Sequence, residues 1–419
     1  MKKVAIMGLG YVGLSVAHGF AKCGYKIFGL EIDDFVVQRI RNSSLNEDVL
    51  SQVKLNELIQ LDFIASLDAS LISQAEYVVI CVPTPISSIG KPDLTFVKEA
   101  SKVISKYLKP NLVVILESTS FPGTTLSVVQ PILEESGFRE GKDFYIAFSS
   151  ERVDPGSSTF SFSNTPKVVS SPSKAGLEKV LELYSPAVTT LVPTTNVMEA
   201  ELSKLIENSY RLINIAFINE IARISAELEV DLMEAIDLAA TKPYGFQKFL
   251  PSVGVGGHCI PVDPVYLQSY LSESSESGRS LVLNAAILAN SNSPFQIATK
   301  IEREVSRIKE VSGLEPEVVL LGITYKKNSS DVRESSGVHL LRRLQEMKLR
   351  VSYYDPLSSV HLEDSQRIDS PRDVTEIKVP LISVIVQPHS DIDFEKFFSI
   401  SVLVLDTTHS YSGANVLTI

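Results

Sequence analysis

Cysteine is scarce in this sequence, and long apolar runs are missing. Its three cysteines, Cys23, Cys81 and Cys259, are too few and too widely spaced for a disulfide framework. We therefore expect a cytoplasmic protein in a reducing environment. No apolar run reaches the roughly 18 residues that a membrane-spanning helix needs, so no membrane partner is expected. The first residues lead directly into a strand pattern, which predicts no signal peptide.

An excess of basic residues is also missing. Lys and Arg number 39 against 50 Asp and Glu, which gives a formal net charge of −11. This charge opposes nonspecific nucleic-acid binding, so no nucleic-acid partner is expected. It does not oppose a phosphorylated small molecule, because local cations and helix N-termini bind phosphate whatever the overall charge. A length of 419 residues, 44% of them hydrophobic, is sufficient for two or three cores.

A dinucleotide-binding pattern lies at the start of the chain. A short apolar strand at 3–7 is followed by the glycine motif GLGYVG at 8–13 and a helical pattern over about 14–24. A glycine motif in this context favours a Rossmann unit. The next strand, 26–30, ends on Glu31, whose carboxylate would accept hydrogen bonds from ribose hydroxyls and repel a 2′-phosphate, so NAD is favoured over NADP. An ordinary βαβ unit without ligand, or a solvated Glu31, is the alternative.

Further apolar strands end in polar side chains. Ligands of open α/β sheets bind beyond the carboxyl ends of the strands. Thr119 is therefore expected near the nicotinamide, and Glu151 occupies a position typical of catalytic groups, although a surface-loop acid explains Glu151 equally well. The expected strands lie at 76–82, 112–116, 144–148, 168–169 and 188–192.

The middle of the chain is helical, and a second α/β pattern follows it. On the long helix expected from 196 to about 229, Lys204, Asn208 and Arg211 form a polar stripe beside an apolar one. A solvated face is the usual explanation of such a stripe, and a ligand-binding face is the alternative. Further helices are expected at 232–240, 281–291, 294–310 and 337–347, a solvated loop or cap at 272–280, and strands at 318–323, 351–354, 381–386 and 402–405.

A glycine-rich stretch at 254–257 directly precedes Cys259 within the helical middle. Its three glycines would let the backbone approach a bulky ligand. Asp263 and Pro264 are suited to begin a helix, which would place Cys259 near the positive helix end, where a thiolate is favoured. An inert, buried cysteine in a tight turn is the alternative.

Over essentially its full length the sequence resembles the nucleotide-sugar 6-dehydrogenases, NAD-dependent enzymes that oxidise the C6 hydroxyl of a UDP-hexose to a carboxylate. The resemblance rests on seven motifs in the family's order: GLGYVG (8–13), CVPTP (81–85), ESTSFPGTT (117–125), SSERVDPG (149–156), KLIENSYR (204–211), GVGGHCIPVDP (254–264) and YKKNSSDVRES (325–335). It implies an α/β fold with two Rossmann-like doubly wound domains joined by a central all-helical domain with a long helix. The expected domains are an NAD-binding domain (1–195), a helical domain that carries the cysteine loop and forms a homodimer (196–312), and a UDP-sugar-binding domain (313–419).

Two motifs, GGHCIPVDP (256–264) and SERVDPG (150–156), resemble the branch of the family that acts on UDP-N-acetylhexosamines, UDP-N-acetylglucosamine above all, for surface polysaccharide synthesis. UDP-N-acetylmannosamine, UDP-N-acetylgalactosamine and UDP-glucose are the alternative substrates. Pro155 stands where the UDP-glucose enzymes have a second glutamate, so no role is transferred from that glutamate. Ser252 replaces the glycine of a proline-glycine pair that is usual in the subfamily, which is expected to alter the loop that reaches the uridine.

The resemblance implies a role for each motif residue, because a four-electron oxidation by two NAD molecules must hold an aldehyde between its two steps. Cys259 would form a thiohemiacetal and then a thioester, and Glu151 would be the base for thioester hydrolysis. Lys204 and Asn208 would stabilise oxyanions, Asp263 would orient a water or Lys204, and Thr119 would hold the water or the nicotinamide. The residues expected to bind the cofactor are Gly8, Gly10, Tyr11, Val12, Gly13, Glu31, Thr84, Thr119 and Arg333. Those expected to bind the UDP-sugar are Glu151, Arg152, Lys204, Asn208, Arg211, Phe249, Gly256 and Lys326.

No metal site is expected, and His258 is given no catalytic role, because sequence neighbours rarely point at each other. Two other classes remain open on the sequence. A two-electron hydroxyacid dehydrogenase would share the glycine motif and a Lys-x-x-x-Asn helix, but would need neither the cysteine loop nor a third domain. A non-catalytic nucleotide-sugar sensor would keep the binding glycines but would not need both Lys204 and Cys259.

Overall fold

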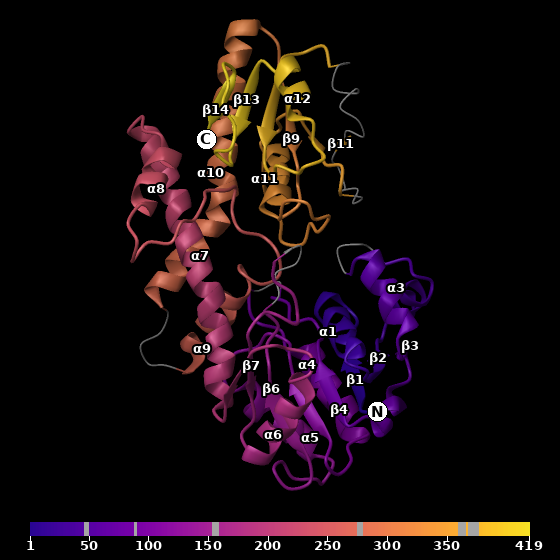
Figure 1. Ribbon diagram of the computed structural model, residues 1–419. Helices are drawn as coiled ribbons and strands as arrows, with labels where there is room; N and C mark the ends of the chain where they lie inside the picture. Colours follow the sequence, from indigo (N-terminus) through magenta and orange to yellow (C-terminus); the bar gives the residue numbers. More distant parts are fainter. Residues whose placement is uncertain (46–49, 88–89, 153–158, 275–279, 359–365, 368–376) are drawn as a thin grey trace. The chain divides into compact units, whose positions relative to one another are not determined.

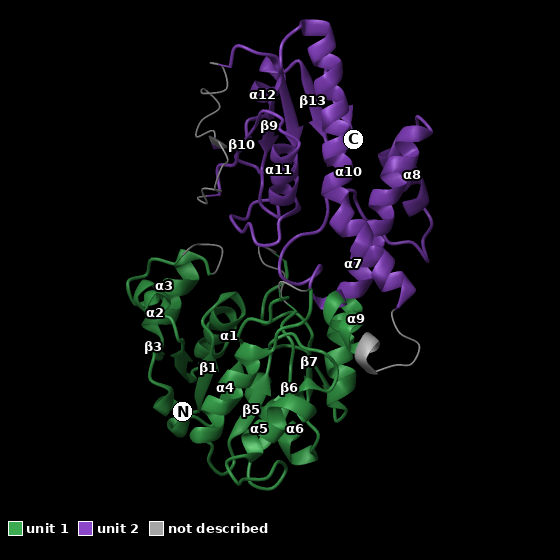
Figure 2. Cartoon of the chain, turned by 180° about the vertical axis from the view of Figure 1, so that it is seen from behind, with its two compact units in different colours: residues 1–207, 265–277 green, residues 208–264, 278–419 purple. Residues whose placement is uncertain are grey.

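A computed structural model of the chain describes residues 1–45, 50–87, 90–152, 159–274, 280–358, 366–367 and 377–419. It separates into two compact units (Figure 2). Unit 1 comprises residues 1–207 and 265–277, and unit 2 comprises residues 208–264 and 278–419. Within the described ranges, no helix is both long and apolar enough to cross a membrane.

An eight-stranded sheet forms the centre of unit 1, in the order β3-β2-β1-β4-β5-β6-β7-β8. The strands are β1 (Lys3–Met7), β2 (Lys26–Leu30), β3 (Phe63–Ser66), β4 (Tyr77–Ile80), β5 (Val113–Leu116), β6 (Tyr145–Phe148), β7 (Lys167–Ser170) and β8 (Leu191–Thr194). All neighbouring strands are parallel except β6 and β7, which are antiparallel. The central strands are continuous apolar runs because helices cover both faces. The strand order reverses between β1 and β4, where open α/β sheets bind nucleotides.

The helices of unit 1 connect these strands (Figure 1). They are α1 (Tyr11–Lys22), α2 (Asp34–Arg41), α3 (Gln52–Gln60), α4 (Thr95–Lys106), α5 (Gln130–Glu134) and α6 (Lys174–Tyr184), with a 3-10 helix η1 (Ala69–Gln74) and a π-helix η2 (Thr125–Val129). The main core lies between the sheet and α1, where the Phe20 ring contacts the rings of Tyr25, Phe162 and Tyr184 at centroid distances of 5.2 to 5.9 Å.

Unit 2 has its own six-stranded parallel sheet, in the order β11-β10-β9-β12-β13-β14. The strands are β9 (Glu317–Leu321), β10 (Val351–Tyr354), β11 (Gln366–Arg367), β12 (Leu381–Ile385), β13 (Leu403–Asp406) and β14 (Val416–Thr418). The first strand of this sheet in the chain, β9, is again central, and the strand order again reverses beside it. The second sheet therefore repeats the doubly wound arrangement of the first. The other helices are α7 (Val197–Glu227), α8 (Leu232–Ala240), α9 (Asp263–Ser274), α10 (Leu281–Ser312), α11 (Ser336–Glu346) and α12 (Phe394–Ile400).

The expected fold class is confirmed, since two doubly wound sheets and a long helix over 197–227 are present. The two helices expected at 281–291 and 294–310 are wrong, because α10 is one continuous helix with Pro294 inside it. A proline removes one helical hydrogen bond. Here Pro294 is buried, and the following turns pack Ile297 and Ile301 into the core of unit 2, which favours continuation. The serine-rich loop expected from residue 272 is partly helical, because α9 runs to Ser274. Residues 275–279 lie outside the described ranges.

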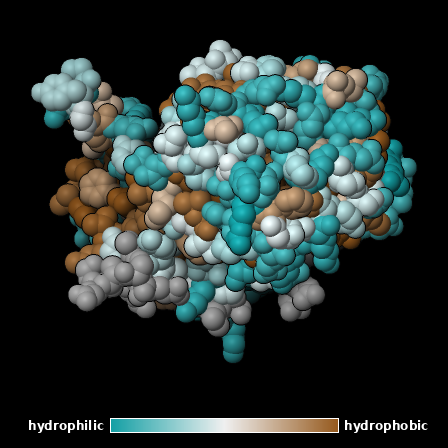
Figure 3. All heavy atoms as spheres, turned by 90° about the horizontal axis from the view of Figure 1, so that it is seen from below, coloured by the Kyte–Doolittle hydropathy of each residue, from teal (hydrophilic) through white to brown (hydrophobic). Residues whose placement is uncertain are grey.

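Large hydrophobic side chains are exposed along α7, α8 and α10. Those of unit 2 are Tyr210, Phe217, Ile224, Leu238, Leu281, Val282, Leu288, Phe295 and Val311. Seen from below, hydrophobic side chains gather along the left edge of the molecule (Figure 3). Exposed apolar groups at this density are typical of a surface that another protein covers.

Candidate active site

The glycine turn after β1 has the shape of a diphosphate cradle. A Cβ on Gly8, where φ is +90°, would lie 2.7 Å from the Cys81 carbonyl oxygen, and one on Gly13 would lie 1.9 Å from the Gly8 carbonyl oxygen. A Cβ on Gly10 would meet nothing within 4 Å. No side chain caps the N-terminus of α1 at Tyr11. The backbone N–H groups of this helix end and the open approach over Gly10 therefore fit the diphosphate of NAD.

Glu31 lies directly after β2, beside this turn. Its Oε2 accepts the Leu9 N–H at 2.9 Å, and its Oε1 accepts the Ile32 N–H at 2.8 Å. These two bonds orient the carboxylate, and each oxygen of a carboxylate has a second lone pair for a ribose hydroxyl. The negative charge at this position opposes a 2′-phosphate.

Polar groups also follow β4 and β5. Thr84 is buried and Thr119 is half-buried. The loop that holds Thr119 is anchored by Glu201, a fully buried residue of α7. Its carboxylate accepts the Thr125 N–H at 2.9 Å and the Thr125 hydroxyl at 2.7 Å. Sequence reasoning missed Glu201, although an acid three residues before Lys204 on one helix face was the available signal.

Two distant motifs meet where β6 ends. Lys204 on α7 donates from Nζ to the Glu151 carbonyl oxygen at 2.8 Å, and the Lys204 side chain is almost fully buried. The Arg152 guanidinium forms an ion pair with Glu207, also on α7, and donates to the Pro166 carbonyl oxygen at 3.0 Å. Unit 1 therefore brings Glu151, Arg152 and Lys204 together. The remainder of the motif, residues 153–156 with Pro155, lies outside the described ranges.

A buried ion cluster lies behind Glu151, and sequence reasoning missed it. Lys167 Nζ lies 3.1 Å from Glu117 Oε1 and 3.4 Å from Glu151 Oε2. Burial raises the pKa of Glu117 despite the nearby ammonium. Burial alone would lower the pKa of Lys167, but Glu117 and Glu151 outweigh it, so the pKa of Lys167 lies above its ordinary value. Burial also raises the pKa of the nearby Cys81 thiol far above its ordinary value, which makes Cys81 unsuitable as a nucleophile.

The cysteine loop is packed closely against residues 325–335 of unit 2. A Cβ on Gly256 would lie 2.5 Å from the Glu334 carbonyl oxygen, and one on Gly257, where φ is +82°, would lie 2.8 Å from the Tyr325 ring. These glycines are therefore required by protein packing, a reason that differs from the expected approach of a bulky ligand. Contact between the Gly256 backbone and the substrate remains a prediction.

Cys259 is exposed, in contrast to the buried cysteine of a tight turn. Its carbonyl oxygen accepts the N–H of Asp263, the first residue of α9, at 2.9 Å. The fully buried Asp263 carboxylate accepts a hydrogen bond from the Asn208 side-chain amide. Asn208 lies one turn from Lys204 on α7, so the polar stripe of this helix is joined to the cysteine loop.

Arg333 and His258 lie in the same unit as Cys259. The carboxylate of Asp331 binds the Arg333 guanidinium at 2.6 to 3.0 Å. This bond raises the pKa of Arg333, and the negative forms of Tyr325 and Cys259 raise it further. Burial and the charge of Arg333 lower the pKa of His258, which favours its neutral form.

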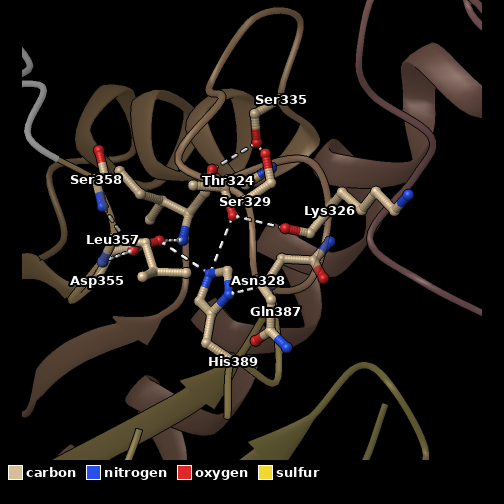
Figure 4. A network of polar contacts seen from close by, with 12 residues as sticks. Thr324, Lys326, Asn328, Ser329, Ser335, Asp355, Leu357, Ser358, Gln387 and His389 are labelled. Carbon is tan, nitrogen blue, oxygen red and sulfur yellow. Dashed lines mark hydrogen bonds and ion pairs between the residues drawn. The ribbon is translucent and has the colours of Figure 1, made fainter. Parts of the chain in front are cut away.

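The loop that carries Lys326 and Arg333 is fixed by a buried histidine (Figure 4). His389 Nδ1 accepts the Asn328 N–H at 2.8 Å, so its proton lies on Nε2, which is 3.0 Å from the Thr324 hydroxyl and 3.3 Å from Asp355 Oδ2. Figure 4 shows the Lys326 side chain directed away from this network. The loop is therefore held at its base by contacts that do not involve the Lys326 side chain drawn in Figure 4. Sequence reasoning missed His389, which carries no local signal.

The other expected ligand-binding residues are accessible. Arg211 is exposed, and Phe249 is half-buried with its ring 6.0 Å from that of Tyr210. Within the described residues, no group of three or more His, Cys, Asp and Glu side chains is arranged to hold a metal ion.

The full chain is similar to known nucleotide-sugar dehydrogenases. Residues 2–188, 198–292 and 319–416 match, in turn, the NAD binding domain, the central domain and the UDP binding domain of the UDP-glucose/GDP-mannose dehydrogenase family. Protein CapL of Staphylococcus aureus is 35% identical over 359 residues, which cover 84% of this chain and 82% of that protein. The UDP-N-acetyl-D-glucosamine 6-dehydrogenase of Pseudomonas aeruginosa is 34% identical over 356 residues, with 84% and 82% covered.

A solved structure gives the same result. The structure of the UDP-D-ManNAc dehydrogenase from Pyrococcus horikoshii superposes with a TM-score of 0.86. The match covers 99% of this chain and 98% of the Pyrococcus chain, and the two sequences are 28% identical. The resemblance drawn from the seven motifs and the expected NAD cofactor are confirmed. The chain belongs to the UDP-glucose/GDP-mannose dehydrogenase family and is an NAD-dependent oxidoreductase.

Proposed function

We propose that this protein oxidises the C6 hydroxyl of a UDP-N-acetylhexosamine, UDP-N-acetylglucosamine before others, to the carboxylate used in surface polysaccharide synthesis. The observation that carries the proposal is the exposed Cys259, whose loop is joined through Asp263 to Asn208, one helical turn from Lys204. A two-electron alcohol oxidation does not need a thiol in this position. A four-electron oxidation does, because the aldehyde must be held between the two steps.

Each residue has a defined part in this chemistry. Lys204 and Asn208 stabilise the alkoxide in the first oxidation. Cys259 then adds to the aldehyde as a thiohemiacetal, which is oxidised to a thioester, and Glu151 takes a proton from the water that hydrolyses it. NAD, bound at the glycine turn, supplies one hydride acceptor for each oxidation. One alcohol, two NAD and one water thus give one carboxylate, two NADH and three protons.

The glycine turn, Glu31, Thr84, Thr119 and Arg333 are proposed to bind NAD. Lys326 and Arg211 provide positive charge for the UDP diphosphate, and Phe249 provides an aromatic face for the uracil ring. Arg152, already paired with Glu207, is proposed to border the sugar site. The division into domains at residues 195 and 312 is also proposed.

A homodimer through the central helix is proposed from the exposed apolar side chains of α7, α8 and α10. A second copy of this chain is the proposed occupant, because α7 combines its exposed aromatic and aliphatic residues, Tyr210, Phe217 and Ile224, with a length of 31 residues. A cytoplasmic location is proposed from the low number of cysteines, three in 419 residues, none of which forms a disulfide.

The choice of sugar rests on the motifs and on relatives that act on two epimers. The Pseudomonas relative is a UDP-N-acetyl-D-glucosamine enzyme, and the Pyrococcus relative is a UDP-D-ManNAc enzyme. UDP-N-acetylmannosamine and UDP-N-acetylgalactosamine are therefore the nearest competitors, and UDP-glucose is the more distant one.

The test is NADH formation with a panel of UDP-sugars. We expect two NADH for each carboxylate formed, with no free aldehyde, and a kcat/KM for UDP-N-acetylglucosamine at least about tenfold above that for UDP-glucose. Equal or better use of UDP-glucose would exclude the acetamido branch. One NADH for each product molecule would exclude the four-electron reaction.

A further inference from the structure

The antiparallel pair β6–β7 is an exception in the otherwise parallel sheet of unit 1, and it has a local consequence. Phe148 on β6 faces Ser170 on β7. Continued three residues past the end of β6 and three residues back to the start of β7, the same register brings Glu151 opposite Lys167. Because β7 runs backward, its first residue lies at the carboxyl end of β6, where the ligands of such a sheet bind. A parallel strand would place Lys167 at the opposite edge.

Lys167 is buried in this position with three oxygen neighbours. Its side chain is 4% exposed, and Nζ lies 3.1 Å from Glu117 Oε1, 3.4 Å from Glu151 Oε2 and 3.4 Å from the Ser150 carbonyl oxygen. The rings of Phe162 and Tyr184 each lie 5.3 Å from the ammonium. A buried cation in this environment stays charged because acceptors and ring faces replace its water.

Two donors orient Glu151 from the protein side. Lys167 binds Oε2, and the Arg152 N–H binds Oε1 at 2.8 Å. The Glu151 side chain is only 9% exposed. Contacts at both oxygens of a nearly buried carboxylate restrict its rotation, and a fixed orientation is a property that a general base requires.

Glu117 holds the other side of the ammonium. Its carboxylate is fully buried and also accepts a hydrogen bond from the Tyr184 hydroxyl. When Glu151 takes up a proton and loses its charge, Glu117 still neutralises Lys167. The cluster can therefore pass through a catalytic cycle without leaving a buried ammonium unpaired.

We propose that Lys167 is a positioning residue that holds the Glu151 carboxylate in a fixed orientation as the base, and that Glu117 is the counterion of Lys167. The inference rests on the proposed role of Glu151 in thioester hydrolysis. The two partners act on Glu151 in opposite directions. The charge of Lys167 attracts the Glu151 carboxylate, whereas the like charge of Glu117 repels it, so removing one or the other should have opposite effects.

The other ionisable groups around the cluster do not change this expectation. Burial raises the pKa of Cys81 and of Tyr184 well above their ordinary values, so both are neutral across the accessible pH range. Lys204 binds the Glu151 backbone, and Arg152 is paired with Glu207. None of these groups is substituted in the Lys167 and Glu117 variants of the test.

The test measures how fast the acyl adduct on Cys259 decays at each pH. At each pH between about 6 and 9, enzyme, UDP-N-acetylglucosamine and NAD are mixed and the reaction is quenched at intervals. The fraction of protein that carries the adduct is then measured by mass spectrometry of the intact protein. For Lys167→Met we expect the acid limb of the decay rate to move up by at least about one pH unit. For Glu117→Gln we expect it to move down, and Lys167→Arg should stay close to the unaltered protein. A merely structural defect would lower the rate without moving the limb in opposite directions.

A double variant keeps the test decisive if Lys167→Met fails to fold, since removing one partner of a buried pair is costly. Lys167→Met with Glu117→Gln removes both charges, and its acid limb should lie above that of Glu117→Gln alone. Unmoved limbs in variants that fold, together with a stalled adduct in Glu151→Gln, would overturn the role of Lys167 and leave that of Glu151 intact. No stalled adduct in Glu151→Gln would instead overturn the role of Glu151, and the inference with it.

Discussion

The side-chain amide of Asn208 donates a hydrogen bond to the buried carboxylate of Asp263. Asn208 belongs to the polar stripe of α7, and Asp263 is the first residue of α9, with its N–H on the Cys259 carbonyl oxygen. One contact thus relates the residue proposed to stabilise the oxyanion to the loop of the proposed nucleophile. Asp263 has therefore a role beyond beginning a helix.

This contact predicts that Asn208 and Asp263 act as one unit. Asn208→Ala and Asp263→Asn should each lower kcat/KM by about 100-fold or more, as expected for groups that act in proton transfer or oxyanion stabilisation. The double variant should lose little beyond the more damaging single change, because residues in direct contact are not additive. The measurement is kcat/KM for NADH formation in all four proteins.

The exposed Glu199 in the first turn of α7 is the matched control. Glu199→Gln should leave kcat/KM unchanged. Losses from Asn208→Ala and Asp263→Asn that simply multiply in the double variant would show that the two side chains act separately.

Glu31 predicts specificity for NAD over NADP. Glu31→Ala removes the oriented carboxylate at the end of β2, so the KM for NAD should rise and the preference over NADP should narrow. Each tenfold change in the ratio of kcat/KM for NAD to kcat/KM for NADP corresponds to about 1.4 kcal/mol. Steady-state kinetics with both cofactors gives this ratio, and Asp34→Ala, an exposed acid three residues on, is the control. An unaltered protein that reduces NADP as well as NAD would contradict the assignment of Glu31.

Asp355 predicts a pH dependence for the loop that carries Lys326. Burial alone would raise the pKa of Asp355, but His389 and the N–H groups of Ile323 and Leu357 outweigh it and hold that pKa below its ordinary value of 3.8. A carboxyl group with a lowered folded-state pKa stabilises the protein above its unfolded-state pKa, and this contribution is lost as the pH falls through the folded-state value. The loop should therefore be most strongly held at neutral pH and loosen in acid.

Asp355→Asn tests this expectation. At pH 7 the variant should show faster amide hydrogen exchange in residues 324–335. The free energy of opening this loop should fall by about 1 to 3 kcal/mol, because buried contacts are broken. The difference from the unaltered protein should shrink below about pH 4. Asp391→Asn, an exposed acid two residues after His389, is the control. If the difference in exchange between the variant and the unaltered protein stayed constant from neutral to acid pH, the effect would come from packing and not from the charge of Asp355.

The fold could be predicted because its strands carry their own signal. Runs such as those at Val113–Leu116 and Leu381–Ile385 are buried on both faces and therefore apolar throughout. The continuity of α10 through Pro294 could not be predicted, because the penalty of a proline is local while the compensating packing of Ile297 and Ile301 is tertiary. The same limit applies to buried partners. Lys167, Glu201 and His389 act on residues 16, 76 and 61 positions away, respectively, and no local pattern records such a pairing.

Cys259 provides the sharpest prediction. Cys259→Ala should still bind NAD and the UDP-sugar, because alanine leaves the glycine backbone of the loop unchanged. Steady-state oxidation should fall by several orders of magnitude, as expected when a covalent nucleophile is removed. Binding is measured by calorimetry and oxidation by NADH formation. Cys23→Ala, which changes a half-buried cysteine at the end of α1, is the matched control and should retain activity.

Glu151→Gln separates the nucleophile from the base. This variant should complete both oxidations once but hydrolyse slowly, so a burst of two NADH should accompany a mass increase of the intact protein equal to one UDP-sugar acyl group. Combining Glu151→Gln with Cys259→Ala should abolish the mass increase, because the thiol that forms the thioester is then absent. A Cys259→Ala protein that still forms the carboxylate at a near-normal rate would make Cys259 a structural residue and favour a two-electron dehydrogenase. Its exposure beside Arg333 would then need another explanation.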